Sequence, residues 1–152
     1  MIVALVALSS LSGCSLINSV PVSTALPDSL PAILGTHWTL FGWGTDNDPE
    51  SLLDGTEITL DFTGAGAGLK GRISGDSGCN NYFGSYEISG DSIKITGIGA
   101  TKKYCAAPDG LMRQEAHFLT LLGSVRGYHL YGEQLDIEDD NGQILFFVAL
   151  HL

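Results

Sequence analysis

The feature that most constrains the fold is an alternation of polar and apolar residues that recurs from Thr36 onward. It is clearest in three segments, Thr36–Phe41, Glu57–Phe62 and Ser92–Ile95. Because successive side chains of a β-strand point to opposite faces, this period of two predicts half-buried strands with one apolar face. Further strands are expected at 70–74, 84–89, 128–131, 134–137 and 144–150. Turn-forming sequences separate these strands, and Asn141-Gly142 predicts a type I′ hairpin.

One segment follows a helical period instead. Its apolar residues fall on one stripe, at positions 111, 112, 118, 119 and 122. Asp109 is expected near the N-cap, and Gly123 at the position that follows the last helical turn. The sequence therefore predicts an α+β fold, a mostly antiparallel, curled and partly barrel-like sheet of about seven or eight strands with a single helix near 110–122.

The N-terminal residues predict a membrane attachment. Residues 1–8 are almost wholly apolar but too few to span a bilayer as a helix, and Leu11-Ser12-Gly13-Cys14 resembles a lipobox. We therefore expect a lipoprotein signal peptide at 1–13 and a lipid on Cys14. The lipid would attach the protein to the cell envelope on an extracytoplasmic side, the outer membrane or the periplasmic face in a Gram-negative cell. A disordered N-terminus or a buried first strand is the alternative.

Residues 14–34 are expected to form a tether between the lipid and the domain. Pro21, Pro27 and Pro31 prevent a regular helix and favour an extended chain. The alternative is that this segment packs on the domain as an irregular arm. The folded domain would then comprise residues 35–152.

The charge balance excludes one class of partner. Seventeen acidic residues against seven basic residues give a formal net charge of −10. A protein that binds nucleic acid needs clustered Lys and Arg to neutralise phosphates, so we expect no nucleic-acid partner.

The densest motif is the segment Ser74–Tyr86, which reads Ser-Gly-Asp-Ser-Gly-Cys-Asn-Asn-Tyr-Phe-Gly-Ser-Tyr. It resembles the signature of the META-domain family of HslJ-like envelope proteins. The resemblance extends over about residues 35 to 150, with Trp38 in the opening strand, Thr101 four residues before Cys105, and an apolar closing strand. It implies the fold, an association with the envelope that often includes a lipid anchor, and no established enzymatic activity. We therefore expect a non-enzymatic binding or structural module, with a role in the envelope stress response as one option.

The resemblance also places the candidate site. Cys79 and Cys105 lie in a compartment that permits disulfides, and we predict that they pair, with two buried free thiols as the alternative. The candidate binding residues are Asn80, Asn81, Tyr82 and Phe83, which combine amide groups with aromatic area beside a pinned cysteine. They would contact an unknown envelope protein or a small ligand. The alternative is that Asn80 caps the turn internally and the aromatic rings enter the core.

Three other patterns favour turns and loops over chemistry. Gly75-Asp76-Ser77-Gly78 matches the nucleophile motif of chymotrypsin-like proteases, but only His37 precedes the serine and the chain is too short for two barrels. Gly66–Gly71 matches a dinucleotide fingerprint, but a strand is expected after it instead of a helix. Acidic residues of the segment 46–57 follow an EF-hand-like spacing, but Ser51 stands at the required glycine. We expect a solvated acidic loop there, with weak calcium binding as the alternative. The acidic residues concerned are Asp46, Asp48, Glu50, Asp54 and Glu57.

The spacing of cysteine and histidine matches no zinc motif, and we expect no metal and no cofactor. His37, His117, His129 and His151 are scattered along the chain. Catalysis by paired carboxylates stays open because no pair stands out. Two alternatives to a binding or structural module are an inhibitor of envelope or foreign proteases and, with less support, a small hydrolase.

Overall fold

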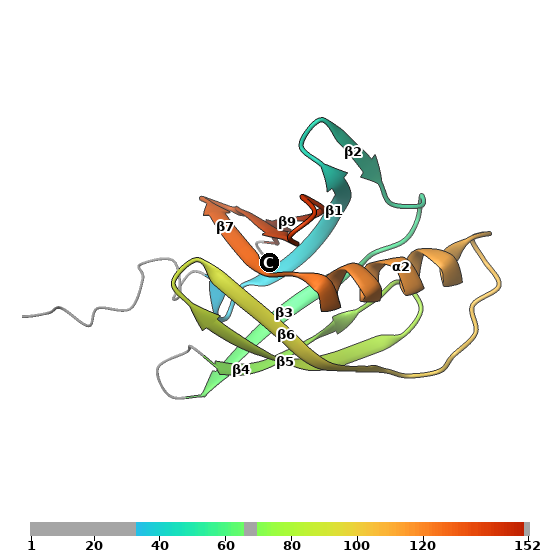
Figure 1. The fold of residues 1–152 in the computed structure, drawn as a ribbon. Coiled ribbons are helices and arrows are strands. Elements are labelled where there is room, and N and C mark those ends of the chain that lie inside the picture. Colours follow the sequence, from blue (N-terminus) through green and yellow to red (C-terminus); the bar gives the residue numbers. More distant parts are fainter. Residues whose placement is uncertain (1–32, 66–69, 151–152) are drawn as a thin grey trace, which may run out of the picture.

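The computed structural model describes residues 33–65 and 70–150 (Figure 1). The predicted signal peptide, Cys14, most of the tether, the loop residues 66–69 and His151 lie outside the described residues. Within the described residues, no helix is long and apolar enough to cross a membrane.

The described residues form one antiparallel sheet and a helix, which confirms the predicted α+β class. Each strand pairs with the next in the order β2-β1-β3-β4-β5-β6-β7-β8-β9, and an additional β1–β9 pairing closes the sheet into a ring. The elements are β1 (His37–Thr45), β2 (Asp48–Ser51), β3 (Thr59–Ala65), β4 (Lys70–Asp76), β5 (Asn81–Ser89), β6 (Ser92–Ala100), α2 (Leu111–Ser124), β7 (Gly127–Tyr131), β8 (Gln134–Glu138) and β9 (Ile144–Ala149).

Strand β2 was not expected from the sequence. The acidic segment 46–57 was expected to be a loop, whereas Asp48–Ser51 pair with the C-terminal half of β1. All four β2 residues are exposed, so the expectation of a solvated segment was right and that of a loop was wrong. A strand without a buried face has no alternation, and it lies at the free end of the sheet, where proline is tolerated.

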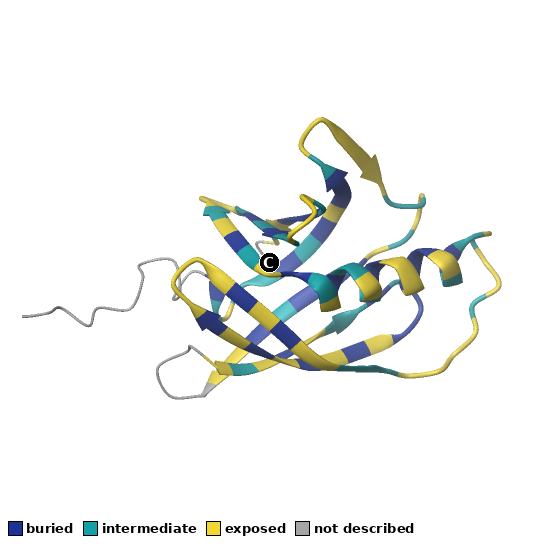
Figure 2. Ribbon diagram, viewed as in Figure 1, coloured by how far each residue is buried: buried dark blue, intermediate teal, exposed yellow. Residues whose placement is uncertain are grey.

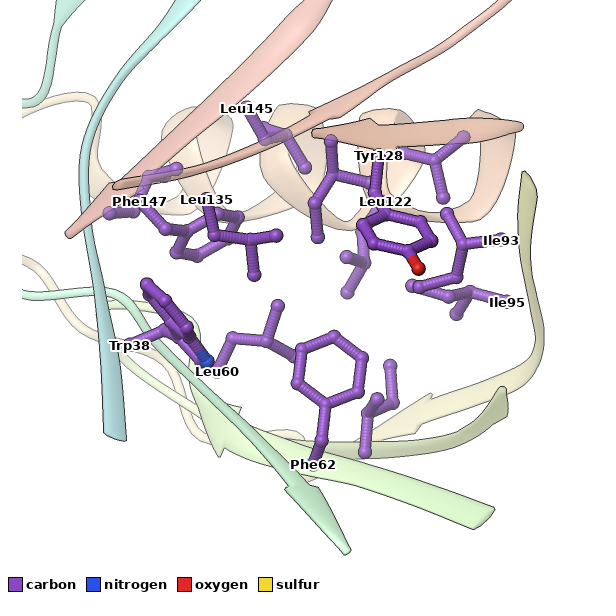
Figure 3. Packing of buried hydrophobic residues seen from close by; sticks show 14 of the residues in the cluster. Trp38, Leu60, Phe62, Ile93, Ile95, Leu122, Tyr128, Leu135, Leu145 and Phe147 are labelled. Carbon is purple, nitrogen blue, oxygen red and sulfur yellow. The ribbon is translucent and has the colours of Figure 1, made fainter. Parts of the chain in front are cut away.

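Alternation explains how the core forms. Buried and exposed residues alternate along β5 and along the first half of β6, as Figure 2 shows. The buried side chains from the ring of strands meet one face of the helix and pack together (Figure 3). Trp38, Leu60, Leu122, Leu135 and Phe147 are among the residues at the centre, each at most 1% exposed.

Helix α2 fills a gap in the ring. Strands β6 and β7 share a single registered pair, Ser92 with Gly127. The helix runs beside β6 (Figure 1), and its Phe118 and Leu122 are fully buried. The position of the helix in this gap determines where its polar side chains enter the domain.

The helix spans Leu111–Ser124, close to the expected 110–122. Asp109 lies directly before the N-cap, which is Gly110 at φ 91° and has no capping side-chain hydrogen bond. Gly123 lies inside the last turn, and the helix ends at Ser124. A Cβ at position 123 would sit 3.5 Å from Ile98 of β6, an ordinary van der Waals distance, so the helix faces β6 at this position. Buried Val125 at the C-cap then ends the helix.

The expected type I′ turn at Asn141-Gly142 was also wrong. Gly142 has φ 77°, but among the described residues no residue other than glycine has a positive φ. The Asp139 carboxylate builds the turn by accepting hydrogen bonds from the amides of Asn141 and Gln143, at 2.8 and 3.0 Å. A side chain that bonds the backbone ahead of it replaces the paired positive φ angles of a type I′ turn.

Candidate functional site

The family-like motif forms the turn between β4 and β5. The Asp76 carboxylate accepts a hydrogen bond from the Gly78 amide at 2.7 Å, and the Ser77 amide donates to the Asn80 carbonyl at 2.8 Å. Gly78 has φ 103°, a conformation that side chains rarely adopt, and a Cβ there would lie 3.0 Å from Leu111. The turn therefore packs directly against the start of helix α2.

A buried carboxylate from the helix holds this turn. Glu115 is 6% exposed. Its Oε2 accepts from the Asn80 amide at 2.8 Å and lies 2.7 Å from the Ser77 hydroxyl, while its Oε1 accepts from Nδ2 of Asn80 at 2.8 Å. A buried carboxylate is tolerated when N–H and O–H groups satisfy its oxygens, and these donors do so.

Asn80 connects the turn to the segment after β6 as well as to the helix. Its Oδ1 accepts from the Thr101 hydroxyl and from the Lys103 amide, both at 2.7 Å, and its Nδ2 donates to the Lys103 carbonyl at 3.0 Å. Together with Glu115, these bonds use the hydrogen-bonding capacity of the side-chain amide. Asn80 therefore holds three segments together inside the domain. We call Ser77, Asn80, Thr101, Lys103 and Glu115 the Glu115 network.

The four candidate binding residues separate into an inner and an outer pair. Besides Asn80, Tyr82 points inward: it is 1% exposed, its hydroxyl donates to the Thr59 carbonyl at 2.7 Å, and its ring meets Phe118 edge to face. Burial raises the pKa of the Tyr82 phenol well above its usual value, and the charges of Asp61 and Asp76 add to that rise.

The outer pair consists of Asn81 and Phe83, which lie on the outer face of the sheet. Asn81 is exposed and Phe83 is 50% exposed. The Phe83 ring covers Gly99 of β6, where a Cβ would clash with it at 2.8 Å. Asn80 and Tyr82 thus follow the alternative of an internal cap and a core ring, whereas Asn81 and Phe83 stay outside, because β5 already begins at Asn81 and its residues alternate.

The predicted disulfide is confirmed. Cys79 and Cys105 are bonded and lie 26 positions apart in the sequence. The bond ties the β4–β5 turn to the exposed segment that leads into α2, close to the bonds that Asn80 makes to Thr101 and Lys103.

The protease-like motif does not form a triad. Ser77 is fully buried and bonded within the Glu115 network. His37 instead binds Asp61, with Nδ1 2.7 Å from Oδ1. The serine opposite Asp61 is Ser74, so the carboxylate, not the imidazole, lies next to a serine. A triad needs the imidazole between the other two groups.

The segment 46–57 does not fold like an EF-hand, because part of it is a strand. Within residues 33–65 and 70–150, no three His, Cys, Asp or Glu side chains come together in a group that could hold a metal ion. Most of the dinucleotide-like sequence lies outside the described residues.

Glu115 and Lys103 were not expected from the sequence to be members of the network. Glu115 had a usable signal, since it lies on the apolar stripe of the helix, four residues after Leu111 and three before Phe118. A carboxylate at such a position is buried and must find donors. Lys103 had none, because it takes part through its backbone.

Comparisons with known proteins agree with this architecture. The family model described as META domain matches residues 31–151. An NMR structure of a protein from Burkholderia xenovorans is 26% identical, with a TM-score of 0.63, over 87% of this chain and 97% of that one. A second NMR structure is 21% identical, with a TM-score of 0.55, over 78% of this chain and 92% of that one, and this likeness concerns the fold alone. No curated protein matches the chain.

Proposed function

The chain belongs to the META-domain family, and on that premise we propose that it is a lipid-anchored, non-enzymatic envelope protein whose domain serves as a binding or structural module. The lipobox-like sequence before Cys14 and the proline-containing tether support the anchor. The Glu115 network supports the non-catalytic role, because it engages the Ser77 hydroxyl of the motif and the Glu115 carboxylate of the helix in internal bonds.

The observation that carries the binding role is the outward half of the motif. Asn81 and Phe83 stand on a strand whose inward side chains are fixed by the core and whose preceding turn is pinned by the disulfide. In the register of the sheet, Phe83 lies between Ser74 and Gly99. We call Ser74, Asn81, Phe83 and Gly99 the Phe83 surface. A rigid, half-exposed ring with an adjacent amide is typical of residues that anchor protein contacts.

The anchor predicts a specific processing product. Mass spectrometry of the mature protein should find an N-terminal peptide that begins at a diacylglyceryl-modified Cys14. The variant Cys14→Ser should keep residues 1–13 and carry no lipid, because the thiol is the acceptor. Ser23→Ala, in the tether, should be processed like the unaltered protein. An unmodified Cys14, or a mature N-terminus elsewhere, would contradict the anchor.

The Phe83 surface predicts a loss of partners without a loss of fold. Affinity capture from the protein's own membranes, quantified by mass spectrometry, should recover a specific partner about tenfold less with the double variant Asn81→Ala/Phe83→Ala, since truncation of an interface anchor costs about 1–2 kcal/mol. The free energy of unfolding should change little. Tyr131→Ala removes another ring, 63% exposed, and should leave capture unchanged. If Asn81→Ala/Phe83→Ala captured the partner as well as Tyr131→Ala does, this surface would be excluded.

One observation favours the protease-inhibitor alternative. The segment between Thr101 and Gly110 is largely exposed, is pinned at Cys105, and presents Tyr104 at 79% exposure. A protruding loop held by a disulfide is the form in which many inhibitors present a side chain to a protease. The same capture experiment decides between the two, because an inhibitor should recover a protease whose binding depends on Tyr104 and not on Phe83.

A further inference from the structure

A second feature of the outer face of the sheet lies on β1, β8 and β9. An irregularity in the β1–β9 register between Leu40 and Gly42 falls at Phe41, whose side chain is 50% exposed. On β9, Leu145 and Phe147 fill the core (Figure 3), so Phe146 between them points to the other face of the sheet, where neighbouring side chains leave it only 7% exposed. The rings of Phe41 and Phe146 lie 5.9 Å apart between centroids.

These rings form the apolar part of a hollow on the surface. Asp46, from the β1–β2 turn, and Pro49 of β2 line it together with Gln134 of β8, and its volume is about 250 Å³. That volume is below the range of about 300–1,000 Å³ that is usual for sites of complete small molecules. The hollow therefore has the size for one side chain of a partner.

Two carboxylates lie near these rings. Besides Asp46 in the lining, Asp136 lies directly opposite Phe146 in the β8–β9 register. Burial raises the pKa of the Asp136 carboxyl. A hydrogen bond of 2.8 Å from Gln134 and the nearby His129 oppose that rise, while the charges of Asp46 and Glu138 add to it. The two carboxylates thus repel each other beside an apolar surface.

No Lys or Arg of the described residues forms an ion pair with Asp46 or Asp136. The sequence explains why, since all seven Lys and Arg residues of the chain fall between positions 70 and 126. Residues 33–61 and 132–150 contain none, but they hold eleven acidic residues: Asp46, Asp48, Glu50, Asp54, Glu57, Asp61, Glu133, Asp136, Glu138, Asp139 and Asp140. Because β1 pairs with β9, both segments lie on the same side of the ring (Figure 1).

Aromatic rings next to unpaired carboxylates are complementary to an organic cation with a flat, weakly hydrated head. A guanidinium can stack on a phenylalanine ring and also bond a carboxylate, whereas an ammonium is a compact and strongly hydrated charge. We propose that the hollow formed by Phe41, Asp46, Pro49, Gln134 and Phe146 binds an arginine side chain from a basic segment of a partner protein. The inference rests on the proposed function only in treating the domain as a binding module, and its site is separate from the Phe83 surface.

The test uses the full chain in a non-ionic detergent and a fluorescein-labelled peptide of alternating Arg and Gly, with fluorescence anisotropy as the readout. The peptide should bind. Matched peptides with citrulline or lysine in place of arginine should bind at least about fivefold more weakly, because citrulline lacks the charge and lysine lacks the planar head. Equal binding of the citrulline peptide would overturn the proposal. Equal binding of the lysine peptide would overturn the choice of arginine.

Variants distinguish binding in the hollow from attraction by the general negative charge on this side of the ring of strands. Asp46→Asn and Phe41→Ala should each weaken binding about fivefold. Asp54→Asn removes one exposed charge outside the hollow and should leave binding nearly unchanged, as should Phe83→Ala. If Asp54→Asn weakened binding as much as Asp46→Asn does, the attraction would be non-specific and the proposal would fail.

A titration of Asp136 adds a readout that non-specific attraction would leave unchanged. In NMR spectra recorded against pH, the pKa of its carboxyl should lie above the ordinary value in the free chain and fall when the Arg peptide is added, because a nearby cation favours the charged form. An unchanged pKa with peptide bound would place the peptide elsewhere and overturn the site. Because this assay involves neither the lipid nor cellular partners, its failure would leave the proposed anchor and the Phe83 surface unaffected.

Discussion

Replacing Glu115 by alanine should lower the free energy of unfolding by about 3 kcal/mol. The substitution leaves the buried Asn80 amide without an acceptor and removes one partner each from Ser77 and from the Asn80 side chain. An unsatisfied buried donor costs about 1–3 kcal/mol, and the cavity left by the side chain adds to that cost. Since small domains are stable by about 5–15 kcal/mol, the loss is a large fraction of the total. Urea unfolding followed by tryptophan fluorescence measures it.

Two further variants separate the hydrogen bonds from the charge. Glu115→Gln keeps one oxygen for Asn80 but directs an NH₂ group at a second donor, so its loss should be smaller than that of alanine and still exceed about 1 kcal/mol. Glu50→Ala, on exposed β2, removes a carboxylate without buried partners and should change stability by less than about 0.5 kcal/mol. If the free energy of unfolding of Glu115→Ala lay within about 1 kcal/mol of that of the unaltered chain, the Glu115 network would not contribute to the stability of the fold.

Elements with one buried face could be predicted from the sequence. Strands β5 and β6 and helix α2 each present apolar residues with the period of their structure, and each was found, although both strands were expected too short, at 84–89 instead of Asn81–Ser89 and at 92–95 instead of Ser92–Ala100. Strand β2 could not be found in this way, because none of its residues is buried. Gly123 was expected just after the helix but lies in its last turn, because the helix continues to Ser124 and ends at buried Val125.

The sequence singled out residues 80–83 as a candidate site but did not separate those that face the core from those that face outward. Alternation could have placed Tyr82 inside and Phe83 outside, had the motif been treated as the start of a strand instead of a loop. The partners of Asn80 depend on segments more than twenty residues away, which local patterns do not specify. The hollow between Phe41 and Phe146 was also beyond prediction, because it exists only when β1 pairs with β9.

Removing the disulfide should have an effect as large as losing the Glu115 carboxylate. The bond between Cys79 and Cys105 closes a loop with a sequence separation of 26. In the chain-entropy account, opening a loop of this length costs about 3.5 kcal/mol of stability. The measurement compares the urea unfolding of Cys79→Ala/Cys105→Ala with that of a chain that keeps the pair, both carrying Cys14→Ser. A reducing agent should destabilise the chain that keeps the pair and leave the double variant unchanged.

The disulfide and the Glu115 network should also prove coupled. Both hold the segment after β6 against the β4–β5 turn, the network through Thr101 and Lys103 and the disulfide through Cys105. Once the covalent tie is lost, the segment can separate from the turn, and the Asn80 bonds then stabilise less than they do in the intact domain. A double-mutant cycle between Asn80→Ala and the loss of the cysteine pair should therefore deviate from additivity by at least about 0.5 kcal/mol. Strict additivity would mean that the two ties act on independent parts of the fold.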